Sequence, residues 1–337
     1  MKFALWYNKN YKKLLILSVI LILASIIYLI TFSIQNDSII HKDVSLTGGV
    51  AYTIETNYSI NELNQKLAEK YPDFSTQSIS DGSGNQIQII VTVQEEDSEK
   101  IQEVLEEILE IKLTEDNSSI ESTSSNISED FFKQLIISII LAFFWMAAVV
   151  FLIFAKGHKI KLIVIFINIL LAIYLGNFFL SINSIVSFLI LGLFTIGLAY
   201  IYIKNSIPSV AVILSAFADI TLTLAVVNLL GMKISTAGIV AFLMLIGYSV
   251  DTDILLTTRV LNKKNTLNKE MFGALKTGLT MSATTIIAVS TALIIVIPFA
   301  SVLNQIFTIL LIGLGFDLFS TWITNASILK WHIEKTK

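Results

Sequence analysis

Eight long apolar segments dominate this sequence and leave few folds open to it. A helix that crosses the hydrocarbon core of a bilayer needs about 20 predominantly apolar residues. Backbone hydrogen bonds at that depth must be made within the segment, so each segment is expected to be a helix. The segments cover residues 14–34, 132–154, 160–180, 184–203, 208–230, 234–256, 277–297 and 303–326. The sequence therefore predicts a polytopic α-helical membrane protein with about eight transmembrane helices.

The composition supports this class and excludes several kinds of site. Hydrophobic residues make up 54% of the chain, and charged residues only 15%. Because the chain has no cysteine, a disulfide scaffold, a thiolate metal site and a cysteine nucleophile are excluded. The three histidines, His41, His158 and His332, lie far apart in the sequence, so no histidine-rich metal cluster is expected. We expect no enzyme activity, no metal and no cofactor.

The basic residues predict the orientation of the chain. If the N-terminus is cytoplasmic, 16 of the 23 lysines and arginines fall in the inner segments, as the positive-inside rule requires. Both termini are then cytoplasmic, and residues 35–131 are extracytoplasmic. The first apolar run is too long for a signal-peptide core, and we expect it to remain as an anchor.

The polar segment 35–131 reads as a small folded domain. Its pattern predicts strands at 49–56, 74–80, 85–93 and 118–127, a hairpin turn at 81–84, and helices from Ser59 to about Lys70 and from near Asp97. Ser59 and Glu62 have the spacing of a capping box. The order βαββαβ is that of a ferredoxin-like α+β domain.

This outer domain is strongly acidic but carries no recognisable catalytic pattern. It holds 20 of the 26 acidic residues and five lysines. These carboxylates are typical of a solvated surface, and such a surface would repel nucleic-acid phosphates. An unfolded secretory chain or a partner subunit is a possible ligand.

Four aspartates fall within the apolar segments, where ionisable groups are costly and are therefore functional candidates. Asp219 lies ~16 Å into its segment, at the middle of the bilayer. A carboxylate at this depth could bind and release a proton, or could be a protonated packing residue that donates a hydrogen bond. Asp251 and Asp253 lie near the inner edge, where they could be hydrated or pair with Arg259, and Asp317 lies below the middle.

The seventh apolar segment is rich in hydroxyl side chains. Thr280, Ser282, Thr284 and Thr285 lie within a few residues of one another. Close helix packing is the first expectation for them, and a water-filled proton path is the alternative.

Residues 245–259, LIGYSVDTDILLTTR, resemble the signature of the SecF family of protein-export membrane proteins in its archaeal form. Three further stretches, 46–49, 208–219 and 277–285, are similar to family segments in the same order. The family-motif residues are Gly48, Gly49, Gly247, Tyr248 and Ser249.

The resemblance implies a role in protein export. Members of the family pair with a SecD-like subunit, and the two resemble exporters of the resistance-nodulation-division superfamily. The implied partners are the Sec translocation channel, the unfolded exported polypeptide and membrane lipid, in the cytoplasmic membrane, with the proton gradient as the energy source. Asp219 matches the proton-relay aspartate and Arg259 the arginine that closes the signature. Asp251, Asp253 and Asp317 are possible coupling or ion-pair residues.

One segment departs from the family pattern, and it completes the division of the chain. We expect a cytoplasmic start and first helix at 1–34, the outer domain at 35–131, a second helix at 132–155, an inserted transmembrane hairpin at 156–204, and a four-helix core with a cytoplasmic tail at 205–337. The hairpin has no charged residue between Ile163 and Ile203, so we predict a peripheral packing or docking element. Two competing functions remain: an exporter of small molecules or lipids, and a non-transporting assembly or docking factor of the translocon.

Overall fold

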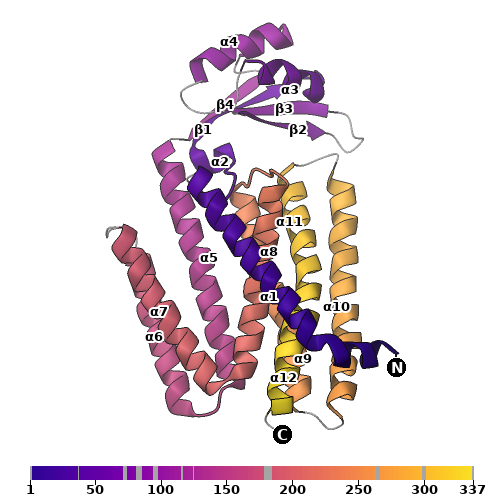
Figure 1. Cartoon of the computed structure of the whole chain (residues 1–337). Helices are drawn as coiled ribbons and strands as arrows, with labels where there is room; N and C mark the ends of the chain where they lie inside the picture. Colours follow the sequence, from indigo (N-terminus) through magenta and orange to yellow (C-terminus); the bar gives the residue numbers. More distant parts are fainter. Residues whose placement is uncertain are drawn as a thin grey trace.

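The computed structural model describes residues 2–335 except 37, 71–73, 81–85, 94–97, 115–116, 124, 178–183, 263–265 and 298–300. Within this part of the chain, eight helices are long and apolar enough to cross a membrane, which confirms the predicted fold class. They are α1 (Lys2–Asn36), α5 (Ser125–Phe154), α6 (His158–Asn177), α7 (Ser184–Asn205), α8 (Ile207–Leu229), α9 (Thr236–Leu261), α10 (Leu267–Val296) and a last helix that begins as α11 (Ser301–Phe319) (Figure 1). The last helix continues through a π-helix, η2 (Ser320–Asn325), into α12 (Ala326–Lys335).

The outer domain stands above one end of the bundle (Figure 1). Its strands β1 (Gly49–Glu55), β2 (Phe74–Ser80), β3 (Gln86–Val93) and β4 (Ser118–Thr123) form an antiparallel sheet in the order β2-β3-β1-β4. Two helices, α3 (Ile60–Ala68) and α4 (Ser98–Leu109), cover the face that points away from the bundle. The element order βαββαβ confirms the ferredoxin-like prediction.

Buried and more exposed side chains alternate along the strands, and the buried ones form the core of this domain. Val50, Tyr52 and Ile54 of β1 are buried in one core with residues of α3 and α4. Ile89, Val91 and Val93 of β3 complete this core. The register joins Tyr52 to Val91 of β3 and to Ile120 of β4. A strand with one face against helices has this period of two.

Two local predictions for the outer domain are wrong, and one lies outside the described residues. Ser59 is the N-cap of α3, but its side chain makes no cap hydrogen bond, so the capping box does not form. The last strand ends at Thr123, because its partner β1 begins opposite at Gly49, and residues 125–127 belong to α5. The turn at 81–84 falls in an undescribed stretch, although β2 and β3 on either side of it do pair.

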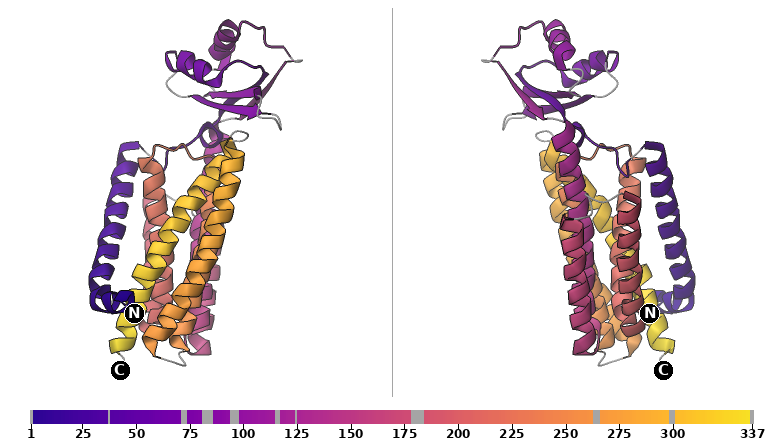
Figure 2. Two further views of the ribbon diagram at one scale, coloured as in Figure 1. Left: turned by 90° about the vertical axis from the view of Figure 1, so that its right-hand side faces the viewer. Right: turned by 90° about the vertical axis from the view of Figure 1, so that its left-hand side faces the viewer.

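The bundle has a buried centre and an exposed rim. In the most apolar window of each helix, 61% of residues are buried in α8 and 56% in α9, but only 6% in α10. The α6–α7 hairpin lies at one side, where α6 packs on α5 and α7 on α8 (Figure 1). Both termini lie at the end away from the outer domain (Figure 2).

A short connection joins the bundle to the outer domain. The helical turn α2 (Val44–Thr47) leads into Gly48 and Gly49, whose φ angles of 84° and 158° are unfavourable for residues with a side chain. Nearby, the amide of Asp43 donates to the carbonyl of Ile234 at 2.9 Å. The domain is therefore held to the α8–α9 connection by backbone contacts.

Candidate functional site

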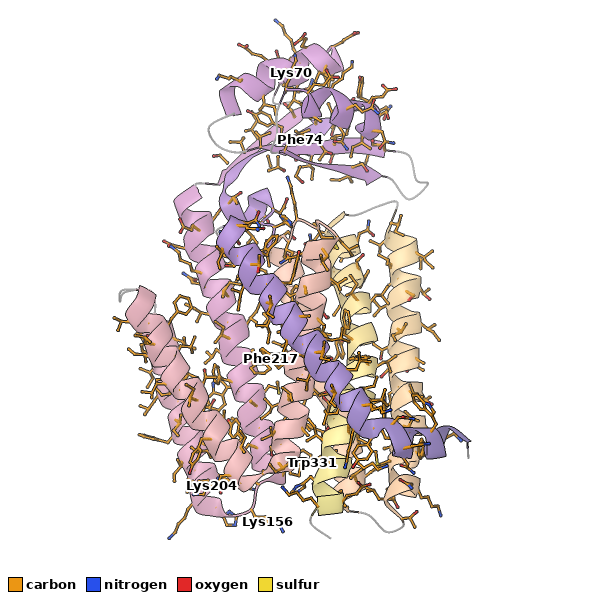
Figure 3. All side chains as sticks on the ribbon, in the orientation of Figure 1. Lys70, Phe74, Lys156, Lys204, Phe217 and Trp331 are labelled. Atoms are coloured by element: carbon orange, nitrogen blue, oxygen red, sulfur yellow. The ribbon has the colours of Figure 1, made fainter. Side chains whose placement is uncertain are left out.

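Three of the four membrane aspartates meet at the centre of the bundle. Asp219 of α8, Asp253 of α9 and Asp317 of α11 have exposed fractions of 0%, 0% and 1%. Their hydrogen-bond partners are neighbours in the chain: Ser320, which donates to Asp219, lies three residues after Asp317, and Thr252, which donates to Asp317, directly precedes Asp253. Phe217, two residues before Asp219, lies at mid-height of the bundle (Figure 3). α8 therefore carries Asp219 close to the middle of the bundle's height.

Asp219 receives hydrogen bonds from two other elements. The hydroxyl of Ser249 in α9 donates to its Oδ2, and the hydroxyl of Ser320 in η2 donates to its Oδ1. The Ser320 Oγ also lies 3.0 Å from the carbonyl oxygen of Phe316. Both oxygens of this carboxyl group are thus engaged, and the contacts join α8, α9 and η2.

Asp317 has weaker contacts. Thr252 of α9 donates to its Oδ2 over 3.4 Å, and Thr321 donates to its Oδ1 over 3.3 Å. Hydroxyl-to-carboxylate bonds are normally 2.5–3.0 Å, so Asp317 is loosely held.

Only one oxygen of the Asp253 carboxyl group accepts a hydrogen bond from a described residue. The amide of Asn325 donates to its Oδ1 at 2.8 Å. Its Oδ2 is buried and makes no hydrogen bond within the described part of the chain, and the same holds for the hydroxyl of Ser215 in α8, which faces it. Buried polar atoms are normally bonded, so the Asp253 Oδ2 and the Ser215 hydroxyl are suited to bind a proton or a water molecule.

The π-helix η2 brings the required side chains into the site. Its polar residues Ser320, Thr321, Thr324 and Asn325 are all fully buried. A π-turn changes which side chains face inward, and such turns are common at functional sites. Sequence reasoning missed these residues, although the polar run STWITN inside an apolar segment was a usable signal.

No basic side chain forms an ion pair with Asp219, Asp253 or Asp317 among the residues described. The alternative of an Arg259 pair with Asp251 or Asp253 is not realised there. Six residues along a helix rotate a side chain by about 120° net, so Asp253 and Arg259 point in different directions. Arg259 instead reaches α10, where a Cβ added to Gly273 would lie 3.6 Å from its Nη1.

Asp251 lies outside the cluster. It is exposed, whereas Asp253 two residues later is buried, because two residues along a helix turn a side chain by about 200°. Proximity in sequence therefore did not bring these two aspartates to one site.

The other motif residues take separate positions. Of the family-motif residues in α9, Ser249 bonds to the cluster, whereas Tyr248 is 47% exposed and a Cβ on Gly247 would meet no atom within 4 Å. Gly48 and Gly49 form the connection to the outer domain, far along the chain from the aspartates.

The hydroxyl residues of α10 do not line the cluster either. Thr280 and Thr284 are exposed and Thr285 is half-buried, and each donates to a carbonyl of its own helix, at 2.8, 2.7 and 3.2 Å. Ser282 alone is buried. The exposed threonines make their hydrogen bonds within α10. The face of α10 that carries them is not covered by other described parts of this chain.

Chemically, the site is a set of proton-binding groups. Throughout the described residues there is no group of three or more histidines and carboxylates placed to hold a metal ion. Hydroxyls and one amide surround the three carboxyl groups, and such groups can exchange hydrogen-bond roles as protons move.

Comparison with known proteins shows which protein family this chain is similar to. Residues 179–335, which include all three aspartates, match the family described as protein export membrane protein SecD/SecF, C-terminal. Over 337 residues the chain is 30% identical to the protein-export membrane protein SecF of Pyrococcus furiosus, covering 99% of this chain and 95% of that protein. It is 49% identical over 140 residues to SecF of Methanocaldococcus jannaschii, covering 40% of this chain and 50% of that protein.

The fold has a solved counterpart. SecDF of Thermus thermophilus, described as a translocon-associated membrane protein, superposes with a TM-score of 0.58 at 16% identity, covering 98% of this chain and 38% of that chain. The likeness shows a shared fold. The chain spans less than half of SecDF, and its match spans about half of the Methanocaldococcus relative.

Proposed function

The chain belongs to the SecF family of protein-export membrane proteins, and we propose that it is an accessory subunit of the Sec protein translocase. In this proposal it lies in the cytoplasmic membrane with both termini in the cytoplasm. It pairs with a SecD-like subunit at the translocation channel and uses the proton gradient to promote export of unfolded polypeptides.

The observation that carries the proposal is the buried cluster of Asp219, Asp253 and Asp317. Three like charges without a basic partner cannot all be ionised together in a low-dielectric interior. The cluster must hold protons or another cation, and loss of one changes the charge balance between α8, α9 and α11. A change of this kind is what coupling to a proton gradient requires.

The contacts of Ser320 support two protonation states. A hydroxyl has one hydrogen, and Ser320 lies against both the Asp219 carboxyl group and the Phe316 carbonyl. An ionised Asp219 accepts that hydrogen. A protonated Asp219 can donate to Ser320, whose hydrogen then turns to Phe316. Proton binding would thus alter the hydrogen bonds of η2, the irregular turn of the last helix.

A partner subunit is supported by the exposed face of α10. Thr280, Thr284 and Thr291 lie on one side of this helix and are exposed, in an apolar window that is only 6% buried. Small and hydroxyl residues are typical of contacts between transmembrane helices. We propose that a SecD-like subunit covers this face and that the acidic outer domain meets the exported chain.

Two other functions are separable from this one. An exporter of small molecules or lipids would have the same carboxylate cluster but would not require the translocon. An assembly or docking factor would use the outer domain and would need Asp219 for packing only.

The test is release of a secreted reporter from cells that carry wild type, Asp219→Asn or, as a matched control, the exposed Asp251→Asn. We expect Asp219→Asn to slow release strongly while the complex still assembles, and Asp251→Asn to be close to wild type. Unchanged release with Asp219→Asn would contradict proton coupling and favour the docking factor. Co-purification with a SecD-like protein separates the translocase role from the small-molecule exporter.

A further inference from the structure

A pocket of about 660 Å³ opens at the end of the bundle away from the outer domain. It lies where both ends of the α6–α7 hairpin join the core: the ends of α5, α7 and α9, the start of α8 and a residue of α12 line it. Its polar lining includes Lys156, Lys204, Asn205, Ser206, Asn262 and His332. The aspartate cluster does not use any of these residues.

The pocket is basic. Lys156 follows α5 and Lys204 lies in the last turn of α7, and both are exposed at the lower end of the bundle (Figure 3). The described residues that line the pocket include no aspartate or glutamate. Glu334, two residues beyond His332, is engaged elsewhere, since it accepts a hydrogen bond from Tyr11 at 2.5 Å and pairs with Lys330 at 3.9 Å. Lys156 and Lys204 therefore have no carboxylate counter-ion within the described lining of the pocket.

The end of α5 does not need Lys156 as a helix cap. Lysines at helix C-termini often bond the last free carbonyls. Here Lys161 does so, donating to the carbonyl of Leu152 at 2.6 Å. Lys156 therefore remains available for a ligand, while Lys204 extends from beside the Tyr200 ring, 5.6 Å from its centroid.

The pocket also has an apolar border. Ile153 and Ile203 line it next to the two lysines, and their exposed fractions are 50% and 55%. A soluble anion gains nothing from such a border, whereas a lipid needs it for the first part of its acyl chains. The proposed topology places this pocket at the cytoplasmic side of the membrane. Basic pockets between helices at that side suit anionic headgroups.

We propose that this pocket binds the phosphate headgroup of an anionic membrane lipid. Lys156 and Lys204 contact the phosphate through charge-assisted hydrogen bonds, Asn205 and Asn262 contact the polar part of the headgroup, and Ile153 and Ile203 lie along its chains. Because the site spans the hairpin and the core, the bound lipid attaches the hairpin to the bundle.

The test uses the full chain purified into nanodiscs of phosphatidylcholine, with or without phosphatidylglycerol. We expect phosphatidylglycerol to raise the melting temperature of wild type and of Lys156→Arg/Lys204→Arg. Lys156→Gln/Lys204→Gln should lose this increase and retain on the order of tenfold less phosphatidylglycerol by native mass spectrometry. Lys12→Gln/Lys159→Gln, which removes two lysines outside the pocket, should behave as wild type.

Three outcomes would overturn the proposal. The first is equal lipid retention by wild type and Lys156→Gln/Lys204→Gln. The second is an equal loss in Lys12→Gln/Lys159→Gln, because the effect would then come from overall charge. The third is an equal rise in melting temperature with inorganic phosphate in phosphatidylcholine alone, because the ligand would then be a free anion. If the glutamine variant does not fold, retention by each single variant decides the question.

Discussion

The centre of the bundle and its α10 rim both carry polar side chains at membrane depth, yet they differ in where those side chains bond. At the centre, Ser249 and Ser320 donate across helices to Asp219. On α10, Thr280 and Thr284 donate to carbonyls of their own helix and stay exposed. Polar residues in a membrane helix therefore form a site only where neighbouring helices supply partners.

The two regions also differ in whether their polar side chains need partners from other helices. A threonine that bonds a carbonyl of its own helix needs no other partner, so α10 can face lipid or another subunit at little cost. Among the described residues, the carboxyl groups of Asp219 and Asp253 have no such local partner and depend on α9 and η2. Disruption of the centre should therefore destabilise this chain, whereas changes on the rim should affect only its associations.

The largest effect is expected from Asn325→Leu. This change removes the donor to Asp253 Oδ1 and leaves both oxygens of a buried carboxyl group without a bond, at a cost of about 3 kcal/mol in the free energy of unfolding. Unfolding in detergent measures it. Asn168→Leu is the control, because Asn168 is equally buried but its amide donates to the carbonyl of Val164 in its own helix, at 2.9 Å. Equal costs would show that cross-helix bonding at the centre is unimportant.

Close packing around the centre gives the next prediction. A Cβ on Gly313 of α11 would lie 2.5 Å from the side chain of Leu245, which is fully buried in α9. Gly313→Val should therefore cost about 2 kcal/mol through overpacking. A Cβ on Gly315, on the same helix, would meet no atom within 4 Å, so Gly315→Val should cost clearly less. The same thermal melts compare the two, and a larger loss for Gly315→Val would contradict the packing.

A direct test of the contrast replaces one hydroxyl from each region. Ser249→Ala removes a donor to Asp219 and should lower the free energy of unfolding by about 1–2 kcal/mol. Thr284→Ala removes an exposed hydroxyl that bonds the carbonyl of Met281, and should change it by less than about 0.5 kcal/mol. If Thr284→Ala were as costly, the rim would be part of the structural core.

The smallest expected effect concerns association and follows from the proposed partner. Thr284→Leu should leave the melting temperature of the isolated chain unchanged. It should weaken the complex with a SecD-like subunit about threefold to tenfold, since the proposed contact between helices loses a small polar residue. Tyr200→Leu, an exposed change on α7, is the control in the same co-purification. Equal retention of the partner by Thr284→Leu and wild type would place the interface elsewhere.

Part of the site was accessible from the sequence. The mid-membrane position of Asp219 follows from counting residues along an apolar segment, and an aspartate at that depth indicates function. The signature pointed to Ser249. The partners of Asp253 and Asp317 were not predictable in the same way. Thr321 and Asn325 come from η2, and hydropathy does not show that a helix changes from α to π at Ser320; Thr252 comes from α9.

The ion-pair hypothesis for Arg259 shows why closeness in sequence does not predict contacts between side chains on a helix. Asp251, Asp253 and Arg259 are close in sequence, but each residue turns a helix by about 100°, so the three face different surroundings. Only packing of α9 against α8, η2 and α10 selects which side chain meets which neighbour.

The amino-acid sequence by itself determined the eight helices, the βαββαβ order of the outer domain and the position of Asp219 near the middle of its helix. These depend on apolar run length and on residue alternation, which are local properties of a chain in oil or water. Only the tertiary structure decided that Asp219, Asp253 and Asp317 meet, that Asp251 does not, and that η2 supplies their partners. Contacts between helices depend on the rotation of each helix about its axis, which is set by all of its neighbours together.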